Sequence, residues 1–418
     1  MRRLSFLATM VCTLVLAGYS LTALGQGYGT DTQNVLTPAA GGMAGVSIAL
    51  PQDVPAAIFG NPATLSQFQG TQFTFGGAWI EGYPTVTRHG FTDPNENFSV
   101  TSRTQGFAGS DIGVTQDLRG LGLPGTFGLG LAGTSGLGAE YRGRAPAGSI
   151  VNDFSTEYMV LGINAGVGFD LNERLSVGAS ATLGAGFEQL GLVSNSAMVH
   201  DYAVRGSLGL DYKLNPCNTV GFFYQTKESF QFPNAVFING AYRDIRLAQP
   251  ETFGFGLANT SLSGGDLLLA ADVYYKLWED APGYSDIFVN QWAFALGAQL
   301  TRGRMKYRLG YSYNTNPVNH NVGSSFSGLP VLQDRIYLLQ ASETAVISQH
   351  RLTAGFGRED FLVRGLDLDF FAGGLLKASD EFGPNTSASV AAYYIGMGLT
   401  WRFGDSKCPC DGDRASGE

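Results

Sequence analysis

The stretch YYIGMGLTWRF, residues 393–403, repeats every two residues along its whole length. One alternate set is large and apolar and consists of Tyr393, Ile395, Met397, Leu399, Trp401 and Phe403. The residues between them include two glycines, a threonine and an arginine. Because side chains alternate between the two faces of a β-strand, this pattern predicts one bulky apolar face and one small or polar face.

The same alternation recurs from residue 71 to the end of this stretch. It predicts fourteen strands, near 71–80, 108–119, 126–143, 155–170, 174–189, 200–214, 217–230, 250–261, 265–278, 288–301, 303–314, 349–359, 362–376 and 388–403. Many exceed the roughly five or six residues of an average strand and reach the roughly 9–11 needed to cross a bilayer. Short turns alternate with long connections at 81–107, 231–249 and 315–348, which is typical of an outer-membrane barrel.

The composition indicates which face meets water. Charged residues make up 15% of the 418 residues, below the roughly 25% of a soluble domain, and 58 residues are glycine. An array of periplasmic β-sandwiches would place the polar face outside. Here that face is rich in glycine and alanine, so we expect the large apolar side chains to face lipid. Hydrocarbon cannot satisfy an open sheet edge, so the sheet must close into an all-β, 14-stranded antiparallel transmembrane barrel.

The two ends of the chain differ from the middle. Residues 1–25 combine two arginines with an apolar run and predict a signal peptide, although an anchor helix is the alternative. Residues 404–418 form a polar tail with Cys408 and Cys410, which is either inert or a soft-metal ligand pair. We expect no metal site and no cofactor.

The motifs that carry chemistry are absent or out of context. GLGLPG at 120–125 and GLGLAG at 128–133 match G-x-G-x-x-G, but neither opens a helix. The four histidines show no metal-ligand spacing, and there is no G-x-S-x-G elbow. The net charge of −9 argues against nucleic acid. We therefore expect that the protein is not an enzyme.

Several features could serve a hydrophobic ligand. Gly133, Gly136 and Gly138 interrupt the strand 126–143 and indicate either a kink or tight packing. The connection 315–348 is apolar and fits either a packed loop or a capture groove, with candidate residues Phe326, Leu329, Val331, Leu332, Ile336, Leu338 and Leu339. The basic residues expected to project inward are Arg205, Lys306 and Arg308.

An apolar stretch, AAIFGNPATLSQF at 56–68, precedes the first strand and is too short to span a membrane. Its Asn61-Pro62-Ala63 tripeptide, after a small-residue segment and before fourteen strands, resembles the long-chain fatty-acid transporter family, the FadL-like proteins. The resemblance implies that residues 26–70 form a hatch inside the barrel of residues 71–403. Its buried apolar residues would be Ile58, Phe59, Leu65 and Phe68.

The resemblance also implies a mechanism. Extracellular loops would capture a hydrophobic ligand, such as a long-chain fatty acid or an aromatic hydrocarbon, and the kinked third strand would release it sideways into lipid. We expect Asn61 and Pro62 within about one residue layer of Gly133–Gly138. The implied partners are the ligand, outer-membrane lipid and the barrel-assembly machinery, with the barrel a monomer in the outer membrane. An adaptor barrel for secretion or surface assembly and a general porin are the alternatives.

Overall fold

A computed structural model describes residues 34–403 except 105, 192–196, 239 and 343. The predicted signal peptide, the first residues of the predicted hatch (26–33) and the polar tail lie outside the described residues. Within the described part, no helix is long and apolar enough to cross a membrane.

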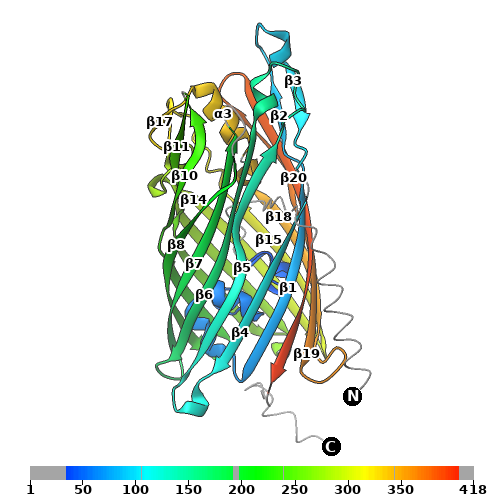
Figure 1. Ribbon diagram of the computed structural model, residues 1–418. Helices are drawn as coiled ribbons and strands as arrows, with labels where there is room; N and C mark the ends of the chain where they lie inside the picture. Colours follow the sequence, from blue (N-terminus) through cyan, green and yellow to red (C-terminus); the bar gives the residue numbers. More distant parts are fainter. Residues whose placement is uncertain (1–33, 105, 192–196, 239, 343, 404–418) are drawn as a thin grey trace, which may run out of the picture.

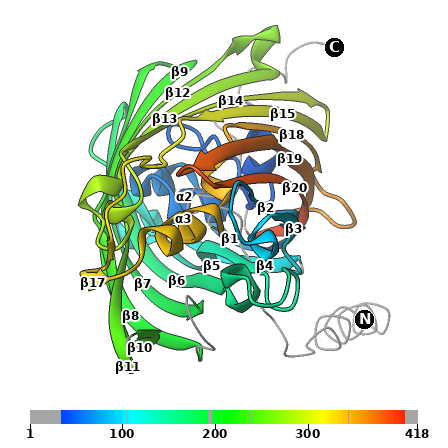
Figure 2. The same ribbon diagram turned by 90° about the horizontal axis from the view of Figure 1, so that it is seen from above.

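Fourteen antiparallel strands form a closed barrel (Figures 1 and 2). The first strand pairs with the last over their whole shared length, from Thr71 opposite Phe403 to Gly82 opposite Ala392. The barrel strands are β1 (Thr71–Gly82), β4 (Phe107–Asp117), β5 (Gly125–Glu140), β6 (Ser155–Asp170), β7 (Leu175–Gly191), β8 (Val199–Asn215), β9 (Asn218–Gln225), β12 (Glu251–Leu262), β13 (Leu267–Leu277), β14 (Gln291–Arg302), β15 (Met305–Asn314), β18 (His350–Arg358), β19 (Leu366–Phe382) and β20 (Thr386–Phe403). The predicted barrel fold is confirmed.

The long connections carry structure of their own at one end of the barrel. Two of them contain hairpins that the sequence analysis assigned as loops: β2 (Thr85–Arg88) with β3 (Phe98–Thr101), and β10 (Glu228–Ile238) with β11 (Ala241–Gln249). The predicted strand 217–230 is therefore too long, because β9 ends at Gln225 and the chain then enters β10. The third connection contains α3 (Gln333–Ser342), which lies over the lumen in Figure 2, and the two-residue strands β16 (Ser325–Phe326) and β17 (Leu329–Pro330).

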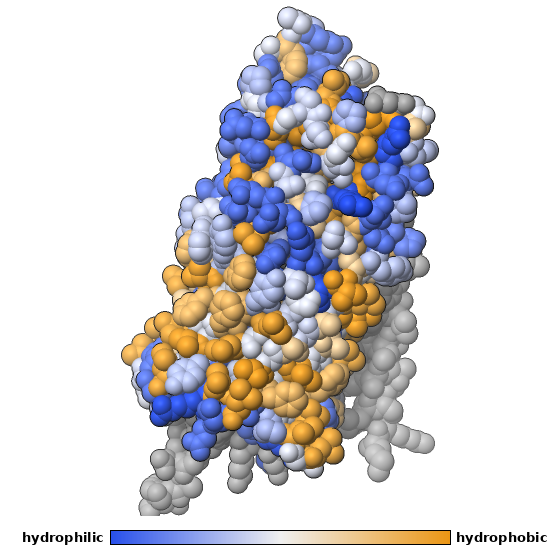
Figure 3. Space-filling model, turned by 90° about the vertical axis from the view of Figure 1, so that its left-hand side faces the viewer, coloured by the Kyte–Doolittle hydropathy of each residue, from blue (hydrophilic) through white to orange (hydrophobic). Residues whose placement is uncertain are grey.

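The two faces of the wall differ as the alternation predicts. Tyr393, Ile395 and Met397 are about half exposed on the outside, whereas Tyr394 between them is buried inside. On the side of the barrel shown in Figure 3, hydrophobic residues concentrate in the lower half and hydrophilic residues in the upper half, toward the long connections. An outer wall of this kind suits hydrocarbon over the lower part of the barrel and water above it.

The segment before β1 lies inside the barrel, where its short helices appear in dark blue in Figure 1. It contains the 3₁₀-helix η1 (Ala40–Met43), the α-helix α2 (Val54–Phe59) and the 3₁₀-helix η2 (Pro62–Gln67). We call residues 34–70 the hatch. Its side chains are almost all buried.

Candidate functional site

The hatch is held together by a buried carboxylate. Asp53 caps α2 by accepting from the backbone N–H of Ala56 at 2.8 Å, while its other oxygen accepts from Ala39 and Ala40 at 2.7 and 2.9 Å. Burial raises the pKa of the Asp53 carboxyl, and the three N–H donors oppose that shift. One side chain thus ties α2 to η1.

The hatch is seated against inward-facing glycines of the wall. A Cβ added at Gly178 would lie 2.3 Å from the carbonyl carbon of Pro62, and one at Gly310 would lie 2.3 Å from the amide nitrogen of Ala44. Real Cβ atoms essentially never approach backbone this closely. The small inner face predicted from the sequence therefore makes room for the backbone of the hatch.

Several hydrogen bonds join the hatch to the wall, and three of the attachment points involve Asp272, Thr353 and Asn61. The Oδ2 atom of Asp272 accepts from the N–H groups of Ser47 and Ile48 at 2.7 and 3.1 Å. The Thr353 hydroxyl accepts from Ala44 N at 2.9 Å. Asn61 Nδ2 donates to the carbonyls of Ile48 in the hatch and Leu210 in β8, at 2.8 and 3.1 Å.

The Asn61-Pro62-Ala63 tripeptide begins η2. Asn61 Oδ1 accepts from Ala63 N at 3.1 Å, and Pro62 is the first helical residue. A Cβ at Gly168 or Gly178 would strike Pro62, so the motif lies against β6 and β7.

The expected proximity of Asn61 and Pro62 to Gly133–Gly138 is wrong. Gly168 pairs with Thr126 on β5, which places Pro62 seven positions below Gly133, roughly 23 Å along the strand. The reason is that the Asn61 amide satisfies the carbonyl of Leu210 in β8, on a different part of the wall.

The apolar residues of the hatch instead reach the lower part of β5. Ile58, Phe59 and Leu65 are buried, and Phe68 is partly buried beside them. A Cβ at Gly130 would lie 3.0 Å from both Ile58 and Phe59. Ile58 and Phe59 of the hatch therefore both pack against β5 at Gly130.

The wall is interrupted between β4 and β5. The two strands pair from Asp117 opposite Thr126 up to Asp111 opposite Ala132, and no further. Beyond that point the pairing of β5 with β6 shifts register between Gly133 and Ser135, so Thr134 is a bulged residue. A bulge bends a strand and increases its twist. The bulge at Thr134 lies within the glycine-interrupted stretch for which the sequence indicates a kink.

We call the unpaired region between residues 107–110 of β4 and 133–139 of β5 the lateral gap. Its upper edge is closed, because Arg103 N donates to the carbonyl of Glu140 at 2.8 Å and Glu140 N donates to Ser102 Oγ at 2.9 Å. The lateral gap is thus bounded above and below by hydrogen bonds.

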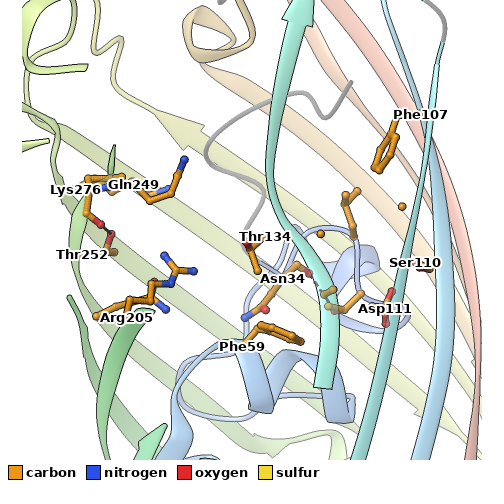
Figure 4. Close-up of a pocket in the computed structure, with 17 residues that line it drawn as sticks. Asn34, Phe59, Phe107, Ser110, Asp111, Thr134, Arg205, Gln249, Thr252 and Lys276 are labelled. Atoms are coloured by element: carbon orange, nitrogen blue, oxygen red, sulfur yellow. Dashed lines mark hydrogen bonds between the residues drawn. The ribbon is translucent and has the colours of Figure 1, made fainter. Parts of the chain in front are cut away.

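A pocket connects the lateral gap to the interior of the barrel (Figure 4). Its volume is about 70 Å³. Apolar groups line it near the gap and hatch, where they include Leu36, Phe59, Phe107 and Ala132. The opposite wall is largely polar and includes Arg205, Gln249, Thr252 and Lys276, drawn at the left of Figure 4. Gln225 and Pro250 also line the pocket.

Two acceptors lie at the end of the pocket toward the gap. Asp111 and Asn34 are buried, and the Oδ1 atom of each has no hydrogen-bond partner among the described residues. Buried oxygens of this kind are rare, because an unmade hydrogen bond there is costly.

The three basic candidates differ in availability. Arg308 is buried and bonded to Asp369 at 2.5 Å, and Lys306 pairs with Glu359 at 2.8 Å, so both lie near the short-turn end with partners of their own. Arg205 lines the pocket, and its Nε atom lies 3.7 Å from Glu228. Lys276 is not among the residues predicted from the sequence, although it follows Asp272 and Tyr274 on the inward face of β13.

Of the two alternatives that the sequence leaves open for 315–348, a packed loop or a capture groove, the burial of its apolar residues favours the packed loop. Phe326, Val331, Ile336, Leu338 and Leu339 are buried, Leu329 is partly buried, and only Leu332 is strongly exposed. They pack with residues of β10, β11 and the 278–288 segment into one apolar core. Such a core removes apolar surface from water, so the connection behaves as a packed loop with α3 as its cover.

An ion-pair cluster fixes α3 to the wall. Arg88 on β2 is buried and contacts Glu96 at 2.9 Å and Asp334 of α3 at 3.0 Å. Glu96 in turn accepts from Ile150 N at 3.0 Å. Three long connections meet at this cluster.

Comparisons with solved structures establish the fold. The toluene transporter TodX of P. putida superposes with a TM-score of 0.65 at 18% identity, covering 89% of this chain and 99% of that one. A FadL homologue of Pseudomonas aeruginosa gives 0.66 at 14% identity, covering 88% and 99%. The toluene transporter TbuX of Ralstonia pickettii gives 0.60 at 16% identity, covering 89% and 99%. No protein-family model matches the sequence, and no curated protein matches it significantly.

Proposed function

We propose that the chain is a non-enzymatic outer-membrane channel of the FadL and TodX type, which takes up hydrophobic small molecules passively. The observation that carries the proposal is the pocket between hatch and wall, which joins the barrel interior to the lateral gap. Phe59 of the hatch and Ala132 of β5 line it together. The path needs no energy source, because the free energy of an apolar solute falls when it moves from water into lipid.

The proposed exit is sideways, through the lateral gap. A fully paired barrel wall has a continuous ladder of backbone hydrogen bonds, and a solute can cross it only where the ladder is absent. Between β4 and β5 the ladder ends at Asp111 and Ala132. A ligand that leaves there would have to displace side chains such as that of Phe107. It would not have to break a backbone hydrogen bond between the two strands. It would enter the hydrocarbon directly.

The polar wall of the pocket favours an amphiphile with an acidic head. Arg205 and Lys276 supply positive charge at one end, and Leu36, Phe59 and Phe107 supply an apolar surface at the other. A long-chain fatty acid uses both ends of such a site, whereas an aromatic hydrocarbon uses the apolar end alone.

Uptake by a transporter-deleted bacterial host tests the proposal. The chain should restore entry of a labelled long-chain fatty acid. An Ala132→Trp variant should abolish it, because Ala132 lines the pocket at the edge of the lateral gap and an indole there would obstruct the path. Gly120→Trp is the control, since Gly120 has open space around it and lies in a short turn away from the gap.

A second comparison separates the ligand classes. Arg205→Gln should lower fatty-acid uptake about tenfold and leave uptake of an alkylbenzene unchanged, because a charged hydrogen bond contributes roughly 1.5–3 kcal/mol. If the inserted barrel transports neither ligand, the proposal fails and the adaptor function takes its place. The hatch argues against a general porin, because it occupies the lumen.

A further inference from the structure

A second hollow lies between the hatch and the inner wall, on the side away from the lateral gap. Its volume is about 30 Å³. Ala293 and Ala295 of β14 form its floor, and their small side chains leave the space between the longer ones of the flanking strands. The hatch contributes Val35 and Ala44. The polar side chains around it are Tyr274, Lys276, Ser312, Asn314 and Arg351.

Arg351 is the unusual member of this set. Its side chain is buried, its Nε atom has no hydrogen-bond partner, and it forms no ion pair with any described residue. The hydroxyl of Ser312, directly opposite Arg351 across the β15–β18 pair, is likewise buried and unpartnered. Lys276, also buried, lines the rim of the hollow. A guanidinium stays charged at any pH a protein survives, so Arg351 brings to the hollow a buried positive charge that no ion pair with a described residue compensates.

The nearest inward carboxylate in register is already engaged. Asp272 lies three strands from Arg351 in the same row, through Ala295 and Ser312, a separation of roughly 14 Å between their backbones. Its Oδ2 atom accepts from Ser47 N, from Ile48 N and from the Tyr274 hydroxyl. Asp272 therefore anchors the hatch and forms no ion pair with Arg351.

We propose that the hollow binds a small monovalent anion of halide size, held by Arg351 and the Ser312 hydroxyl. A cavity needs roughly 10–15 Å³ to hold one water, so 30 Å³ accommodates one such ion but no alkyl chain. The anion neutralises the buried charge. Because Ala44 borders the hollow and bonds to Thr353, the bound ion also stabilises the seat of the hatch.

The arginine on the neighbouring strand shows the contrast. Arg308 on β15 is equally buried on the inner wall, but Asp369 and Gln299 both bond to its guanidinium. Arg308 thus has its counter-ion within the chain, and Arg351 takes its own from solution.

Crystals of the full-length protein grown in sodium bromide test the site by anomalous scattering. We expect one bromide within hydrogen-bonding distance of Arg351 and Ser312, at least tenfold weaker in Ser312→Ala and absent in Arg351→Gln. Arg308→Gln is the control and should retain it. Absence of bromide from the hollow, or a peak of equal height in Arg351→Gln, overturns the proposal.

A stability measurement gives a second readout and identifies the source of the anion. Thermal unfolding should occur at a higher temperature in chloride than in gluconate at equal ionic strength, and Arg351→Gln should lose this difference. Equal unfolding temperatures in the two salts count against the site. Formate should displace the bromide, and decanoate should not. Displacement by decanoate would assign the hollow to the head group of an amphiphile and overturn the free-ion assignment. Neither outcome depends on whether the chain transports a ligand.

Discussion

Single glycines decide how the hatch fits. Gly168, Gly178 and Gly209 face the lumen, and the backbone of Pro62 and Ala63 and the side chain of Asn61 occupy the volume that their side chains would fill. In a soluble β-protein such positions would carry core side chains. Here the hatch fills the space that core side chains would fill. Only glycine, with a hydrogen atom as its side chain, leaves room for it.

We expect Gly178→Val to displace η2 from the wall. The added Cβ would lie 2.3 and 2.4 Å from backbone atoms of Pro62 and Ala63, which cannot rotate away as a side chain can. Ion conductance of the barrel in planar bilayers should rise severalfold, because the hatch no longer fills the lumen. Gly206→Val is the matched control, since its nearest atom beyond its chain neighbours, Ser180 O, is 3.9 Å away. Equal conductance of the two variants would contradict this account of the seat.

At the scale of elements, one strand differs from the rest. β5 leaves β4 above Ala132 and continues along β6 with an extra residue at Thr134. The sequence marks this stretch with three glycines but cannot say which partner β5 abandons. That depends on the neighbouring part of the chain, since Ser102 and Arg103, which precede β4, bond to Glu140.

Deletion of Thr134 should straighten β5. Gly133 pairs with Leu161 and Ser135 with Val160, so removal of the residue between them restores a continuous register with β6 and keeps every later side chain on its present face. The β4–β5 ladder should then extend beyond Asp111 and Ala132. Slower amide hydrogen exchange in residues 107–110 would show it. Deletion of Ser263, in a short turn, provides a comparison, and unchanged exchange in 107–110 would refute the role given to the bulge.

At the scale of the whole molecule, the polar and apolar side chains of the barrel are distributed in the reverse of the order found in a soluble protein. Its outer wall is apolar, while the lumen holds the hatch, its anchoring carboxylates and the polar wall of the pocket. The four tryptophans report on this division. Trp79, Trp292 and Trp401 are 41%, 45% and 40% exposed on the outer wall, and Trp278 is 0% exposed within the core of the long connections.

Brominated lipids should therefore quench three tryptophans and spare one. In single-tryptophan variants reconstituted in such bilayers, the fluorescence of Trp79, Trp292 and Trp401 should fall strongly, and that of Trp278 should not change. Bromine quenches only at short range, so contact with lipid is what the experiment measures. Strong quenching of Trp278, or none of Trp292, would show that a different surface faces the lipid.

The sequence by itself determined the barrel, its fourteen strands and the direction of its faces. Strand length, period-two alternation and turn length are local properties, and the requirement that an apolar wall close on itself completes the argument. The sequence also indicated that the stretch containing Asn61 is buried.

Only the tertiary structure decided what the inward side chains meet. Asn61 bonds to β8 and does not reach the kink, and the apolar residues of 315–348 pack into a core. Arg308 is paired with Asp369, whereas Arg205 and Lys276 line the pocket. These outcomes depend on contacts between residues far apart in the sequence, such as Asn61 and Leu210, which are 149 positions apart, and Arg308 and Asp369, which are 61 apart. Alternation along one strand fixes which way a side chain points, but the residue it reaches depends on how the barrel closes and how the hatch is seated.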